Sequence, residues 1–176
     1  MPRLPYKSDA DAGPDEIVAP IRARRGGKLL HLDRQLLYSP PLAAGWNELM
    51  GAVRGRTALP AHLREIAICV VATLNRAPYE FHHHAPLLRA AGASEAQLDA
   101  LRDLDGIDRP GLYDLAERAT IRLATEMTRA VEVTDETFAT ARAALGDDRQ
   151  LVELVGTIAA YNMVSRVIVA LGIAPE

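Results

Sequence analysis

The chain has very little cysteine and few aromatic residues. Its 176 residues include a single cysteine, Cys69, and only 5% Phe, Trp and Tyr. One cysteine excludes an internal disulfide, a Cys-x-x-Cys redox pair and a four-cysteine zinc site. Cys69 lies within the apolar stretch "IAICVVATL" (66–74), where we expect it to be a small, buried core residue.

Strong charge of one sign and long hydrophobic runs are also missing. The net charge is −3, and the only basic block is "RARRGG" (22–27), so nucleic acid is not an expected partner. The N-terminus lacks the charged-then-apolar order of a signal peptide, and no apolar run reaches the roughly 18–20 residues that a membrane span needs. We therefore expect a cytoplasmic protein with no membrane partner.

Strand signals are absent, whereas helix signals are frequent. The sequence shows no strand alternation and no Asn-Gly hairpin turn, and Ala and Leu dominate its 49% of apolar residues. These features predict an all-α fold. Two almost wholly apolar segments, about 60–75 and 149–171, predict two buried central helices. Because such helices are hard to bury within 176 residues, we expect a homo-oligomer.

The chain divides into two parts of different composition. Residues 1–30 are expected to form an N-terminal arm with a short helix, because the first fourteen residues are polar and rich in proline. Residues 31–176 are expected to form a single helical domain.

The stretch "RAPYEFHHHAPLLRAAG" (76–92) carries three consecutive histidines behind a glutamate. Glu80 and His84 are four residues apart, so on a helix they lie on one face. His84 shares that face with apolar residues and is expected to point into the core. His82 points roughly the opposite way, toward solvent, and His83 is intermediate.

Two interpretations of the Glu80–His84 pair remain open. Buried polar groups must be paired, so the pair can serve packing alone. Glu65, at the start of the preceding apolar helix, favours a second interpretation. Two carboxyl groups and an imidazole on adjacent helices can shift each other's pKa values, and this arrangement suits proton transfer.

The segments "LPAHLREIAICVVATLNRAPYEFHHHAPLLRAAGASEAQLDAL" (59–101) and "ELVGTIAAYNMVSRVIVALGI" (153–173) resemble the carboxymuconolactone decarboxylase and alkylhydroperoxidase D superfamily. The resemblance extends over roughly residues 40–173. It implies an AhpD-like helical bundle whose subunits assemble as trimers or hexamers, with sites near the subunit interfaces.

The peroxidase branch of this superfamily carries Glu-x11-Cys-x2-Cys-x3-His. Laid on this chain from Glu65, the two cysteine positions fall on Ala77 and Glu80, and the histidine falls on His84. Because peroxide reduction there needs an attacking and a resolving thiol, thiol peroxidase activity is not expected. The branch that lacks the cysteine pair has an acid-and-histidine segment, which Glu80 and His84 match.

The resemblance and the residues together suggest a carboxy-lyase-like enzyme that transfers protons on a small carboxylated substrate without a cofactor or a metal. His84 is the expected general acid or base, Glu80 is expected to orient it, and Glu65 is expected to complete the relay. The expected substrate-binding residues are His83, Tyr79, Tyr161, Asn162 and Arg166. Arg166 would hold a carboxylate, or else pair with a structural acid such as Glu153 or Glu48.

Several alternatives stay open at this stage. Glu80 and His84, with either His83 or Glu65, could bind a metal ion. The chain could also be a non-catalytic oligomeric module that binds a ligand or a partner, because a fold does not determine a function. Within the enzyme class, the same groups suit isomerisation, retro-aldol cleavage or lactone hydrolysis as well as decarboxylation.

Overall fold

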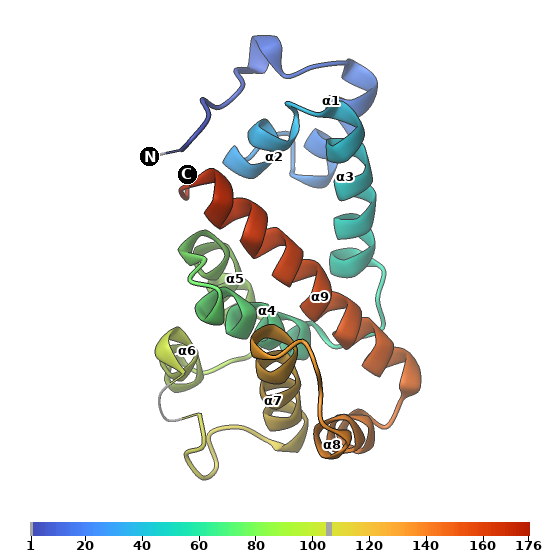
Figure 1. Ribbon diagram of the computed structural model, residues 1–176, viewed down its shortest axis with the longest axis vertical. Helices are drawn as coiled ribbons and strands as arrows, with labels where there is room; N and C mark the ends of the chain where they lie inside the picture. The colour runs from blue at the N-terminus through green and yellow to red at the C-terminus, as the bar shows by residue number, and fades with distance from the viewer. Residues whose placement is uncertain (1, 105–106) are drawn as a thin grey trace.

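The computed structural model describes residues 2–104 and 107–176, and these residues form helices and no strands (Figure 1). This confirms the predicted all-α class. A short 3-10 turn at Asp9–Asp11 precedes the α-helices. The helices are α1 (Asp15–Arg24), α2 (His31–Leu36), α3 (Pro40–Gly55), α4 (Ala61–Leu74), α5 (Pro78–Ala90), α6 (Glu95–Asp103), α7 (Leu115–Arg129), α8 (Asp135–Leu145) and α9 (Asp148–Leu171).

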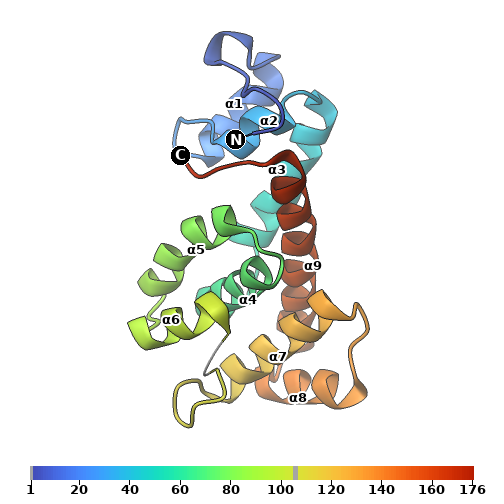
Figure 2. The ribbon, with the colours of Figure 1, turned by 60° about the vertical axis from the view of Figure 1, so that its left-hand side comes forward.

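The two predicted central helices are α4 and α9. Helix α4 packs against α5, α7 and α9, and its side chains from Glu65 to Ala72 are all buried. Helix α9 crosses the molecule diagonally, with α1–α3 at one end and α7 and α8 at the other (Figures 1 and 2). Together they build the core, because each is apolar over most of its surface.

Helix α9 is buried along one face only. Its buried face includes Leu154, Ile158 and Tyr161, whereas Val152 and Val169 are exposed. Among the described residues, α9 is the one helix long and apolar enough to cross a membrane, with a mean hydropathy of 1.6. Such a helix was not expected from the sequence, and it is weak evidence for a membrane span because the core helices of soluble proteins meet the same test.

The helix ends follow local sequence signals. Ser94 and Asp114 begin α6 and α7 with capping boxes, in which each side chain accepts a hydrogen bond from the backbone N–H three residues later. Helix α9 ends at Gly172, whose φ of 65° is left-handed. These signals explain why most of the helices lie close to the segments that the sequence indicates.

The N-terminal segment packs onto the far end of α9. The Arg3 backbone N–H donates to the Leu171 carbonyl, and the Gln35 side chain donates to the Leu4 carbonyl. Figure 2 shows the chain after α9 running beside α2, where His31 contacts Ala174 and Glu176. Both terminal segments are thus held against the end of α9 and the start of α2.

Candidate active site

A cavity of about 530 Å³ lies between α1, α3, α5 and α9. Its polar lining includes Tyr79, Glu80, His83 and His84 from α5, and Tyr161 from α9. The structure therefore brings five of the eight predicted site residues to one cavity. Glu65 is not part of the lining, but it contacts His84 directly.

Three side chains from three helices form a hydrogen-bonded series. His84 Nδ1 on α5 is 2.6 Å from Glu65 Oε2 on α4, and His84 Nε2 is 3.1 Å from the Tyr161 hydroxyl on α9. All three residues are buried, with side-chain rings of His84 and Tyr161 meeting edge to face. Because each member belongs to a different core helix, the packing of α4, α5 and α9 fixes the geometry of the series.

Burial and charge determine where the protons lie. Burial lowers the pKa of His84, so its imidazole is neutral near pH 7. Burial raises the pKa of Glu65, but the hydrogen bond from His84 and the nearby Arg64 outweigh it and hold the pKa below its usual value. Burial also raises the pKa of Tyr161. The Tyr161 O–H therefore donates to His84 Nε2, and His84 Nδ1–H donates to the Glu65 carboxylate.

The expectation that Glu80 orients His84 is wrong. Both ring nitrogens of His84 are engaged by Glu65 and Tyr161, although Glu80 lies one turn away on the same helix. Neither carboxyl oxygen of Glu80 has a hydrogen-bond partner among the described residues. Burial raises the pKa of Glu80 to about 9, so this group is a neutral carboxylic acid facing the cavity.

The three histidines are placed as the helical pattern predicts. His82 is exposed, His84 is buried and His83 is half-buried at the edge of the cavity. His83 Nε2 is 2.9 Å from Glu176 Oε2, and the Tyr79 hydroxyl donates a hydrogen bond to Glu176 Oε1. His83 and Tyr79 therefore attach the end of the described chain to the rim of the cavity.

Two predicted substrate-binding residues, Asn162 and Arg166, lie outside the cavity. Arg166 is exposed and donates to the backbone carbonyl and the side-chain oxygen of Asn162. Asn162 donates in turn to Thr128 and accepts from Asn75. Neither predicted structural acid, Glu153 or Glu48, pairs with Arg166: Glu153 pairs with Arg149 and Glu48 with Arg56. The position of each residue around α9 explains why this prediction was wrong. Tyr161 faces the cavity, whereas Asn162 and Arg166 lie on another face of the helix.

The cations that line the cavity are Arg24, Arg25 and Arg54. Sequence reasoning did not assign them to a site. The only available signal was the basic block "RARRGG" that contains the first two. Their approach to α5 and α9 depends on how α1 and α3 pack, which no local pattern in the sequence reveals.

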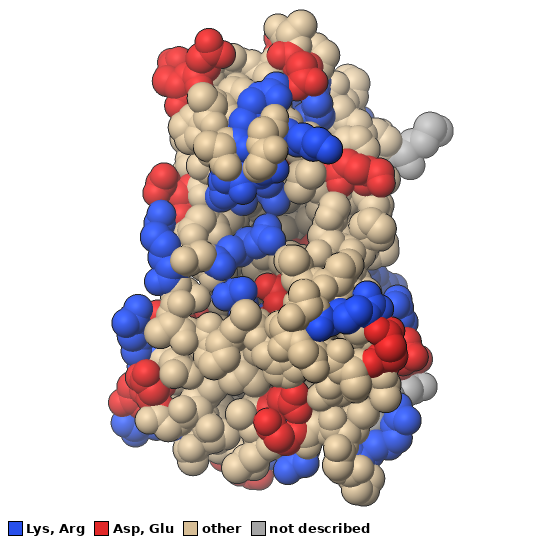
Figure 3. Space-filling model, turned by 180° about the vertical axis from the view of Figure 1, so that it is seen from behind, with Lys and Arg blue, Asp and Glu red and all other residues tan. Residues whose placement is uncertain are grey.

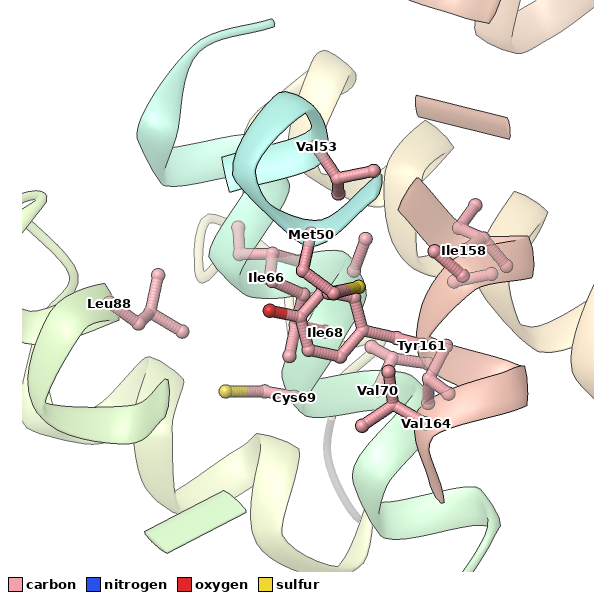
Figure 4. Close-up of a cluster of buried hydrophobic side chains, with 14 of the residues drawn as sticks. Met50, Val53, Ile66, Ile68, Cys69, Val70, Leu88, Ile158, Tyr161 and Val164 are labelled. Atoms are coloured by element: carbon pink, nitrogen blue, oxygen red, sulfur yellow. The ribbon is translucent and has the colours of Figure 1, made fainter. Parts of the chain in front are cut away.

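The described residues contain no cluster of three His, Cys, Asp or Glu side chains placed to hold a metal ion. The alternative in which Glu80 and His84 share a metal with His83 or Glu65 therefore has no matching geometry in these residues. Cys69 is fully buried, and burial raises the pKa of its thiol. Figure 4 shows its sulfur pointing away from Tyr161. Both features make Cys69 unreactive in the folded chain.

Comparisons with known proteins agree with the fold. The chain resembles the crystal structure of an uncharacterized peroxidase-related protein from Silicibacter sp. TM1040, with a TM-score of 0.81 and 20% identity over 100% of this chain and 94% of that one. It also resembles an alkylhydroperoxidase AhpD core protein from Ralstonia eutropha JMP134, with a TM-score of 0.83 and 18% identity over 100% and 93% of the two chains. The architecture is thus that of the AhpD-like helical proteins.

The family follows from these structures together with a sequence match. Residues 40–126 match the model of the carboxymuconolactone decarboxylase family. This match and the AhpD-like structures together support the carboxymuconolactone decarboxylase and alkylhydroperoxidase D superfamily. A further similar structure is the debrominase Bmp8 in complex with 2,3,4-tribromopyrrole, with a TM-score of 0.76 and 17% identity over 97% and 90% of the chains. No curated protein matches the sequence.

Proposed function

We propose that this protein is an acid/base enzyme that moves protons on a small carboxylated substrate, in a decarboxylation or a related lyase or isomerase reaction. One observation carries the proposal: a hydroxyl, an imidazole and a carboxylate are hydrogen-bonded in series, and the tyrosine and the histidine of the series line a cavity. Perturbed groups gathered at a cavity are typical of catalytic sites.

The relay reaches the substrate through Tyr161. His84 has no free ring nitrogen, so a proton taken from a substrate carbon passes to the Tyr161 oxygen while the Tyr161 proton passes to His84 Nε2. The imidazolium that results is stabilised by the Glu65 carboxylate. The roles are those of the hydroxyl, imidazole and carboxylate in hydrolase triads. The reverse transfer returns the proton to carbon.

Glu80 supplies the second half of the chemistry. When a carboxyl group next to a carbonyl leaves as CO₂, the electrons of the broken C–C bond form an enolate. A neutral carboxylic acid can donate a hydrogen bond to the enolate oxygen, as neutral acids do in apolar sites. Glu80 is placed to do so, because its carboxyl group is protonated, unpartnered and part of the cavity wall. The enolate carbon then takes the Tyr161 proton, and water returns a proton to the Tyr161 oxygen.

NMR in deuterated water tests the proposal. We would offer carboxylated lactones and β-keto acids to the wild-type protein and to the Glu65→Gln and Tyr161→Phe variants. Loss of CO₂, or exchange of carbon-bound protons for deuterium, is expected to fall about 100-fold or more in both variants. Tyr38→Phe is the matched control, because Tyr38 is exposed and donates to the Pro5 carbonyl outside the cavity. Equal rates in Tyr161→Phe and Tyr38→Phe would refute the relay.

We also propose that the chain assembles as a trimer or hexamer. Apolar side chains remain exposed on α3 and α9, including Leu42, Leu49, Val152 and Val169. A second copy of the chain would remove this surface from water. Light scattering at micromolar concentration measures the mass, and a monomer would contradict the proposal.

A further inference from the structure

One wall of the active-site cavity is built from arginines. Arg24 and Arg25 come from the end of α1, and Arg54 comes from the last turn of α3. Figure 3 shows Lys and Arg side chains gathered beside a hollow in the middle of one face. Arg24 and Arg25 lie outside residues 40–126, the segment that matches the family. Two of the three arginines of this wall therefore lie outside the family segment, and Arg54 lies within it.

One carboxylate serves two of these arginines. Asp33, which is 2% exposed, lies 3.1 Å from Arg25 Nε and 3.8 Å from Arg24 Nη2. Asp33 Oδ2 also accepts a hydrogen bond from the Leu30 backbone N–H, so the Asp33 carboxylate is divided among two guanidinium groups and one backbone N–H. Arg24 Nη2 and Arg25 Nε are buried with no well-aligned hydrogen bond among the described residues.

Arg54 has no acidic partner at all within the part of the chain that the structure describes. It is half-buried, and it lies close enough to Tyr161 and His84 to influence both electrostatically. A half-buried guanidinium without a partner keeps hydrogen-bonding capacity for a ligand. Its place beside Tyr161 puts that ligand next to the proton relay.

The other wall does not offset this charge. Glu80 is protonated, because burial raises its pKa. Burial lowers the pKa values of His83 and His84. Glu65 is ionised, but Arg64 Nε lies 3.2 Å from it. Glu176 pairs with His83 at the rim and does not line the cavity. Three guanidinium groups in the lining are therefore set against two nearby carboxylates, Asp33 and Glu176, and the cavity favours an anion.

We infer that Arg24, Arg25 and Arg54 form an oxyanion subsite that holds a carboxylate or phosphate group of the substrate beside Tyr161. Guanidinium groups bind both oxyanions through paired N–H donors. The subsite specifies which substrate group the proposed enzyme would bind, and its role in catalysis rests on the proposed function. Its occupancy does not require turnover, so the two can fail separately.

Isothermal titration calorimetry at low ionic strength tests the subsite with inorganic phosphate, succinate, acetate and chloride as probes. We expect saturable binding of phosphate or succinate, and the preferred probe tells a phosphate ligand from a carboxylate ligand. Arg54→Gln should weaken that binding by tenfold or more. Because no residue in the described ranges pairs with Arg54, this variant should fold as the wild type does.

Two further variants sharpen the test. Arg56→Gln is the matched control, because Arg56 is exposed, pairs with Glu48 and lies outside the cavity. It should bind the anion as the wild type does. Asp33→Asn should bind the anion more tightly, because it removes the competing carboxylate. No saturable binding of any probe, or equal losses in Arg54→Gln and Arg56→Gln, would overturn the inference. If deuterium exchange is still observed after such a result, the proton relay remains supported and only the subsite is refuted.

Discussion

The buried carboxyl group of Glu80 should make the folded protein less stable at neutral pH. Glu80 is 2% exposed, its oxygens have no hydrogen-bond partner among the described residues, and burial raises its pKa to about 9. In the unfolded chain a glutamate loses its proton near pH 4.3. Replacing Glu80 with neutral, isosteric glutamine should therefore stabilise the protein.

The sign and the magnitude follow from proton linkage. From about pH 4.5 to pH 9, the folded state keeps a proton that the unfolded state has lost. The free energy of unfolding then falls by about 1.4 kcal/mol per pH unit. Below pH 4.5 both states are protonated, so Glu80 adds no penalty there. At pH 7 the accumulated penalty is about 3 kcal/mol, and Glu80→Gln should remove it.

Urea unfolding followed by circular dichroism, at fixed protein concentration, measures this effect. The stability advantage of Glu80→Gln over wild type should grow from below about 1 kcal/mol at pH 5 to about 3 kcal/mol at pH 7. Glu16→Gln is the matched control, because Glu16 is exposed at the start of α1. If the free energies of unfolding of wild type and Glu80→Gln differ by the same amount at pH 5 and pH 7, the assignment of a neutral carboxyl group is refuted.

Three further predictions concern single side chains. His84→Ala leaves the buried Glu65 carboxylate without its imidazole donor and should destabilise the protein by about 3 kcal/mol in urea; an unchanged midpoint would contradict the pairing. Cys69, fully buried, should react with a thiol reagent only as fast as the chain unfolds; fast labelling of native protein would be the contrary result. Arg166→Gln should change deuterium exchange and anion binding less than twofold, because Arg166 is exposed outside the cavity, and a tenfold loss would return it to the site.

The positions of the site residues show how far local patterns reach. The 3.6-residue period of α5 correctly predicted that His84 is buried and His82 exposed. The same period suggested that Glu80 pairs with His84, and this was wrong. A residue one turn away shares a face, but a side chain on an adjacent helix can approach a ring nitrogen more directly. Glu65 occupies that position and Tyr161 takes the other nitrogen.

The sequence by itself determined the helices, the central place of α4 and α9, and the absence of a cysteine pair, because these depend on hydrophobic period, capping residues and the number of cysteines. Only the tertiary structure decided which groups meet at the cavity. Arg24, Arg54 and Tyr161 are far apart along the chain and come together because α1, α3 and α9 pack around one space. The neutral state of Glu80 is likewise a product of packing, since a carboxyl group keeps its proton only where the surrounding helices exclude water.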